Sequence, residues 1–82
     1  MRNITLRRIK SVGLAEWKDR DWWSRRNVLI WSGEHHAWWR PNAEGYTILQ
    51  REAWSVDFPT AYEYTNHCGP EKKISYFALP IG

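Results

Sequence analysis

The chain has 82 residues, which suits one small domain and excludes a multidomain architecture for this stretch. Cys68 is the single cysteine, so an intrachain disulfide is excluded and large buried side chains must supply stability, with seven Trp, four Tyr and two Phe available. No apolar run reaches the length of a signal-peptide core or a membrane span, so we expect a cytoplasmic protein without membrane contact.

The formal net charge of +3 is unevenly distributed along the chain. Residues 1–26 carry eight basic and three acidic side chains, whereas residues 27–82 carry four basic and six acidic ones. We therefore predict a basic N-terminal extension over residues 1–26 and a small folded domain over residues 27–82. Such an extension either binds nucleic acid or an acidic partner, or is a solvated arm.

The basic extension contains two candidate elements. Residues 1–13 mix apolar and basic side chains in an imperfect alternation, which indicates a weak strand or an arm. Residues 14–25 favour a short helix, with Ser11 as a candidate cap. Trp22 and Trp23 lie among charged residues in the stretch KDRDWWSRR, which suits contact with nucleic acid or a protein groove. We favour the alternative that they fold back onto a sheet face left open by the body.

Two strands are expected at the start of the body. The stretch NVLIWS (27–32) is rich in β-branched and aromatic residues, and HAWWR (36–40) follows it after a turn, so we predict an antiparallel hairpin. Because side chains alternate along a strand, Trp38 and Trp39 must point to opposite faces of the sheet. Pro41 ends the second strand, since it donates no backbone hydrogen bond.

The main helix is predicted over residues 57–68. Asp57 is a plausible N-cap, and Gly69 followed by Pro70 supplies the stop. Helical spacing gives the segment one apolar face, made of Phe58, Ala61, Tyr62, Thr65 and Cys68.

Two shorter elements flank the main helix. Thr47 and Gln50 have the spacing of a capping box, which predicts a brief helix through Ala53. The stretch KKISYFALPI (72–81) predicts a closing strand.

The predicted order of elements is β-β-(short α)-α-β. It indicates an α+β fold, a small two-layer domain with an antiparallel sheet of about three strands packed against one main helix. Three strands leave two edges and an uncovered face, so we also expect a homo-oligomer.

Metal binding is not indicated. The nitrogen and sulfur ligands available are His35, His36, His67 and Cys68. Adjacent residues of a strand point apart, and the second pair lacks the separated partners of a zinc site, so we predict no metal and no cofactor.

Catalysis is weakly indicated. Cys68 could pair with His67 or His36, but its place on the apolar helix face predicts an inert thiol. Glu34 and Glu44 flank the Trp-Trp strand, yet their spacing does not require a catalytic pair. No glycine-rich phosphate loop is present, and we predict a protein that is not an enzyme.

Binding through aromatic stacking is the stronger hypothesis, and it centres on residues 35–47 (HHAWWRPNAEGYT). A Trp face and an Arg guanidinium are what a base with phosphates requires. Trp39 or Trp38 would stack the ring and Arg40 would bind an anion. The predicted hydrogen-bonding residues are Asn42, Tyr46, Thr47 and His36. The alternative is that the two Trp side chains are core and dimer contact and that Arg40 pairs with Glu44.

The stretch LIWSGEHHAWWRPNAEGYT (29–47) resembles a motif of the form WSxEHxAWWRPNxxGYT in short, mostly uncharacterised proteins of tailed bacteriophages and prophages. The resemblance covers about residues 27–80, and such proteins commonly begin near NVLIWS, which marks residues 1–26 as an added segment. It implies a phage-encoded protein that works in the host cytoplasm.

Together, the residues and the resemblance lead to one main hypothesis and two alternatives. The main hypothesis is an anti-defence accessory protein that sequesters a nucleotide-type signalling ligand in an aromatic, Arg-flanked pocket. One alternative is a protein–protein inhibitor of a host defence nuclease or polymerase. The other is a nucleic-acid binder that acts through the basic N-terminal arm.

Overall fold

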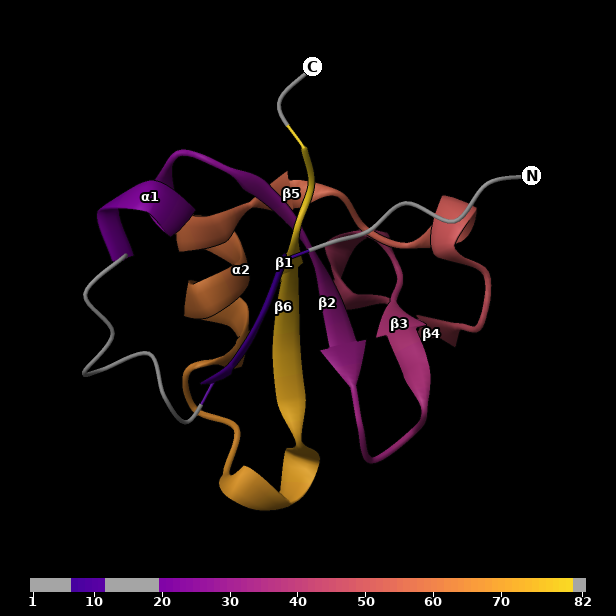
Figure 1. Ribbon diagram of the computed structural model, residues 1–82. Coiled ribbons are helices and arrows are strands. Elements are labelled where there is room, and N and C mark those ends of the chain that lie inside the picture. Colours follow the sequence, from indigo (N-terminus) through magenta and orange to yellow (C-terminus); the bar gives the residue numbers. More distant parts are fainter. Residues whose placement is uncertain (1–6, 12–19, 81–82) are drawn as a thin grey trace.

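The computed structural model describes residues 7–11 and 20–80 (Figure 1). Strand β1 (Arg7–Lys10) and helix α1 (Arg20–Ser24) precede strands β2 (Asn27–Ser32), β3 (Ala37–Trp39) and β4 (Tyr46–Thr47). Strand β5 (Val56–Asp57) leads directly into helix α2 (Phe58–Thr65), and β6 (Ile74–Ala78) follows. Short 3-10 helices lie at Pro41–Ala43, Gln50–Glu52 and Pro70–Lys72.

The strands form one antiparallel sheet in the order β1-β6-β2-β3-β4, and β5 pairs with the start of β2. The predicted α+β class with one main helix is confirmed, but the predicted number of about three strands is wrong, because the sheet has six. Two of the additional strands, β4 and β5, contain two residues each, which is too short for any alternation to be visible. The third, β1, pairs with a strand from the far end of the sequence.

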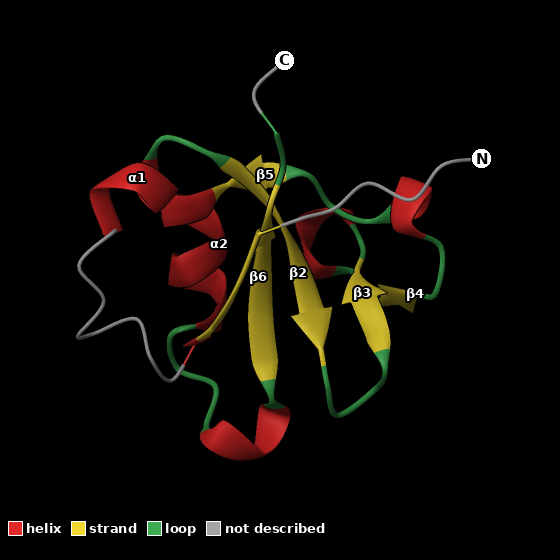
Figure 2. Ribbon diagram, viewed as in Figure 1, coloured by secondary structure: helices red, strands yellow, loops and turns green. Residues whose placement is uncertain are grey.

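The hydrophobic core lies between the sheet and the two helices, with α2 packed along one face (Figure 2). We call this face the inner face; it is formed by Val28, Ile30, Ile74, Tyr76 and Ala78. Helix α2 contributes Phe58 and Ala61, and Phe58 stacks edge-on against Tyr76 with ring centroids 5.2 Å apart. Burial of these apolar side chains is the main stabilising contribution to a domain of this size.

Helix α2 begins where the sequence predicts. Asp57 is its N-cap, and Oδ2 of Asp57 accepts a hydrogen bond from the backbone N–H of Thr60 at 3.1 Å. Hydrogen bonding to Thr60 lowers the pKa of Asp57, because it favours the ionised carboxylate. The helix ends at Thr65, three residues before the predicted end, and the predicted apolar face buries Phe58, Ala61 and Thr65.

The predicted boundary at residue 26 falls between elements that share one sheet and one core. Strand β1 pairs with β6 over four residues, and Trp23 of α1 is fully buried against Phe58 with ring centroids 5.8 Å apart. Trp23 therefore joins the core on the inner face, not on an open sheet face as we expected. The predictions for residues 1–6 and 12–19 lie outside the described residues.

The predicted capping box is wrong in detail. A 3-10 helix does form at Gln50–Glu52, but its cap is Leu49, without a side-chain hydrogen bond. The Thr47 hydroxyl instead accepts from the N–H of Leu49 and donates to Glu52 at 3.0 Å.

In the part of the chain that the structure describes, no helix is long and apolar enough to cross a membrane.

Candidate functional site

The second face of the sheet carries aromatic and basic side chains. We call it the outer face; its strand register brings together Arg8, Trp31, Trp38, Ser75 and Phe77. The half-buried ring of Trp38 meets Trp31 and Phe77 edge-on, with centroids 4.9 and 5.1 Å away. Trp39 packs against the core, so the prediction that Trp38 and Trp39 point to opposite faces is confirmed.

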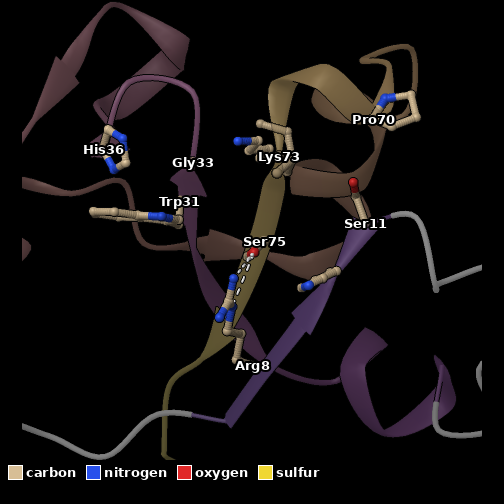
Figure 3. Close-up of a pocket in the computed structure, with 10 residues that line it drawn as sticks. Arg8, Ser11, Trp31, Gly33, His36, Pro70, Lys73 and Ser75 are labelled. Carbon is tan, nitrogen blue, oxygen red and sulfur yellow. Dashed lines mark hydrogen bonds between the residues drawn. The ribbon is translucent and has the colours of Figure 1, made fainter.

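A hollow of about 440 Å³ lies on the outer face, at the end of the sheet where the β2–β3 turn approaches the start of β6. Figure 3 shows Trp31 and His36 on one side of it and Ser11 on the other, with Ser75 between them and the Arg8 side chain reaching up to Ser75. This volume lies in the range of small-ligand sites. The hollow is therefore built by β1, β6 and the β2–β3 hairpin together.

Close backbone contacts hold the two rims of the hollow in place. The N–H of Gly33 donates to the carbonyl of Lys73 at 3.0 Å, and the N–H of Glu34 donates to the carbonyl of Lys72 at 3.4 Å. A Cβ atom on Gly33 would lie 2.6 Å from the Cβ of Lys73, so only glycine permits this approach. Lys73 and His36 both have left-handed backbones with φ of 51°, a conformation that is costly for side-chain-bearing residues and is enriched at functional sites.

Replacing Gly33 with alanine is therefore expected to destabilise the fold by about 1–3 kcal/mol, because the new methyl group overlaps Lys73. Urea denaturation measures this loss. Gly69→Ala is the matched control, since its new methyl group meets only the flexible carboxylate of Glu71, which can move aside. Equal losses in the two variants would contradict the close approach at Gly33.

The hollow is electropositive. Two N–H groups of the Arg8 guanidinium, at Nε and Nη2, donate to the Ser75 hydroxyl at 3.2 and 3.1 Å, which fixes the guanidinium against the sheet. Lys10 and Lys73 also line the hollow, and neither makes an ion pair with another described residue. None of the ten described residues that line the hollow is acidic.

Two acidic side chains are adjacent in sequence to lining residues, Glu34 beside Gly33 and Glu71 beside Pro70, and the carboxylate of Glu34 is already occupied. Oε1 of Glu34 lies 3.3 Å from Nζ of Lys72 and 3.2 Å from Nε2 of His35. This carboxylate raises the pKa of Lys72, because it favours the charged ammonium. Glu34 therefore compensates the charge of Lys72, whereas Lys10 and Lys73 make no ion pair with a described carboxylate.

The seven predicted ligand-binding residues do not form one site. His36 lines the hollow on the outer face, whereas Trp39 and Tyr46 line a second hollow of about 270 Å³ together with Tyr64. Trp38 lies on the outer face but is not among the residues that line the hollow there.

The other three predicted residues, Arg40, Asn42 and Thr47, are not among the residues that line either hollow. Arg40 runs past Gly45, where its Cδ would lie 3.9 Å from an added Cβ, and it forms no ion pair with Glu44 among the described side chains. Asn42 adopts a left-handed backbone in the Pro41–Ala43 turn, and Thr47 is engaged by Glu52. The predicted window thus divides between two faces of the sheet.

The basic residues of the hollow were missed as site residues by the sequence analysis. Arg8 and Lys10 are two residues apart, which places both side chains on one face of a strand. That spacing was a usable signal, but the partner strand of β1 could not be inferred from it. Lys73 and Trp31 join them only through the β1–β6 and β6–β2 pairings.

Cys68 lies outside both hollows. It is half-buried, and burial raises the pKa of its thiol, so the reactive thiolate is disfavoured. Over residues 7–11 and 20–80, no group of three or more His, Cys, Asp or Glu side chains is placed to hold a metal ion.

The comparisons with known proteins provide no relative from which a role could be transferred. No family model, no curated protein and no solved structure matches this chain. The resemblance to short phage proteins therefore stays a prediction, and the candidate function follows from the geometry of the outer face.

Proposed function

We propose that the protein binds a phosphate-bearing aromatic ligand of the nucleotide class in the hollow on the outer face. The observation that carries the proposal is the combination of an aromatic wall with unpaired cations. Trp31 offers a ring for stacking, and Lys10 and Lys73 offer positive charge with no carboxylate among the described lining residues. Stacking and charge-assisted contacts of this kind are the two interactions that a nucleotide supplies.

The same features support binding without catalysis. The described side chains around the hollow supply cations, hydroxyls and aromatic rings, and no carboxylate or thiol is among them. The proposal keeps the predicted role of a non-enzymatic binder and moves its site from the Trp39–Arg40 region to the hollow.

Titration calorimetry with deoxyadenosine monophosphate tests the proposal. We expect saturable binding, and a loss of about tenfold in affinity when Lys73 is replaced by asparagine, because one phosphate contact is worth roughly 1.4 kcal/mol. Asparagine is chosen because it tolerates the left-handed backbone at this position. Trp31→Leu should weaken binding by a similar factor through lost stacking.

Lys72→Asn is the matched control for Lys73→Asn. The two lysines are adjacent, but the charge of Lys72 is compensated by Glu34 and its side chain does not line the hollow. We expect the affinity of Lys72→Asn to stay within about twofold of the wild type. Equal effects of the two substitutions, or no detectable nucleotide binding by the wild type, would remove the proposed site.

The biological setting forms the finer part of the proposal. A phage-encoded protein that removes a nucleotide signal used in host defence would need the capacity to bind a nucleotide and no catalytic group.

The protein-inhibitor alternative and the homo-oligomer stay predictions. For these, the exposed apolar side chains of Ile48 and Leu49 next to the edge strand β4 are the surface of interest, since exposed apolar clusters favour protein contacts.

A further inference from the structure

A second basic cluster lies at the other end of β1. The guanidinium carbon of Arg26 lies 4.1 Å from the ring centroid of Trp22, and that of Arg7 lies 4.4 Å from the same centroid. Trp22 is half-buried and packs edge-on against the fully buried Trp23, so its ring is fixed to the core. The core thus holds two guanidinium groups in place around one indole ring.

Strand β1 connects this cluster with the hollow. It lies at one edge of the sheet, and three of its four residues are basic, namely Arg7, Arg8 and Lys10. Alternation sends Arg7 to the side of Trp22, whereas Arg8 and Lys10 line the hollow. Arg7 and Lys10 are three residues apart, which is about 10 Å along an antiparallel strand, and Arg7 points to the opposite face of the sheet from Arg8 and Lys10. A ligand that contacts both groups must therefore pass around the edge strand β1.

The surrounding charge extends the basic edge. Residues 7–26 carry seven Arg or Lys side chains against three acidic ones. A mononucleotide can occupy the hollow but cannot reach both ends of β1. A ligand with regularly repeated phosphates contacts both, and each Lys or Arg that neutralises a phosphate adds to affinity through counterion release.

We propose that the ligand of the hollow is a single-stranded nucleic acid, with one base against Trp31 and the phosphate backbone following β1 to the Arg7–Trp22–Arg26 cluster. This inference rests on the proposed nucleotide site and specifies its ligand. The strand must be single because the base at Trp31 has to leave its stack and its pair to enter the hollow. In this arrangement Arg26 contacts a phosphate, because the Trp22 ring holds its guanidinium at a fixed position 4.1 Å from the ring centroid, and Arg7 lies against the same ring.

Calorimetric titrations with deoxyadenosine monophosphate, with oligodeoxyadenylates of increasing length and with a duplex of the same sequence test this assignment. We expect affinity to rise at least tenfold from the mononucleotide to the longer single strands and the duplex to bind more weakly than these. Binding of the long strands should weaken between about 50 and 200 mM salt, with each phosphate contact adding about 0.7 to the slope of log K against log salt.

Variants separate the two ends of β1. Arg26→Gln should weaken oligonucleotide binding about threefold, lower the salt slope by about 0.7, and leave mononucleotide binding unchanged. Lys73→Asn should weaken the binding of both the mononucleotide and the oligonucleotides. Arg7→Gln serves as a second variant of the cluster, and Arg51→Gln, in the 3-10 helix after the opposite edge strand β4, is the matched control. Unchanged melting temperatures establish that each variant is folded.

Three results would overturn the inference. Long strands that bind no tighter than the mononucleotide, a duplex that binds as well as the single strand, or Arg26→Gln and Arg7→Gln with wild-type affinity for long strands would each contradict it. In all three cases mononucleotide binding would persist and the proposed function would stand. Absence of binding by every ligand, the mononucleotide included, would instead remove the proposed function together with the inference.

Discussion

Replacing Trp23 with alanine is expected to remove most of the stability of the protein. Trp23 is fully buried between α1 and α2, and truncation of a buried Trp costs about 3–5 kcal/mol through lost burial and the cavity left behind. A domain of this length has a free energy of unfolding of roughly 4–12 kcal/mol. Urea denaturation followed by circular dichroism should therefore show a transition shifted strongly to lower urea, or none at all.

Trp22→Ala is the matched control for this prediction. Its ring is half-buried and lies against two guanidinium groups, so we expect a loss below about 2 kcal/mol. A larger loss for Trp22 than for Trp23 would contradict the placement of the two rings.

The stability of the protein is also expected to fall as the pH rises from 10 to 12. Burial raises the pKa of Tyr76 from its ordinary value of 10 to about 12, because a phenolate in the core would lose its hydration. The neutral phenol is the form that the fold stabilises, so its contribution is complete below pH 10 and is lost as the pH passes through 12. By linkage, the loss amounts to about 3 kcal/mol.

Urea midpoints measured across this pH range check the prediction. The contribution is isolated by comparison with Tyr76→Phe, whose stability should decline less steeply with pH because the titrating hydroxyl is gone. Tyr64→Phe, at an exposed position, should follow the wild-type curve. Since the Tyr76 hydroxyl is hydrogen-bonded to Thr65, Tyr76→Phe should also be somewhat less stable than the wild type at neutral pH. Parallel curves for the wild type and Tyr76→Phe would show that this hydroxyl does not titrate with unfolding.

The elements that could be predicted from the sequence are those with a strong local pattern. The apolar run at 27–32 forms β2, and the Asp57 cap with its helical spacing gives α2 to within three residues at its C-terminal end. Strands β4 and β5 could not be predicted, because a strand of two residues is too short to show an alternation of apolar and polar side chains. Strand β1 has an ambiguous pattern of its own and is fixed by its pairing with β6, which no local window contains.

The candidate site was predictable in its chemistry and not in its location. Aromatic stacking with basic side chains is found on the outer face, but the predicted window gathered residues that are neighbours in sequence. Strand alternation divides such neighbours, as Trp38 and Trp39 show. The hollow instead gathers Arg8, Trp31 and Lys73 from three separate segments, and only the strand order places them together.

The pairing of β1 with β6 determines the stage of folding at which the hollow is complete. Arg8 and Ser75 are 67 residues apart in sequence, so their contact closes one of the longest loops in the fold. Local structures such as the β2–β3 hairpin and α2 can form earlier, because their contacts close short loops. A nascent or partly folded chain with these elements in place still lacks one wall of the hollow. Under the proposed function, only molecules that have completed folding would capture the ligand, and folding intermediates would leave it free.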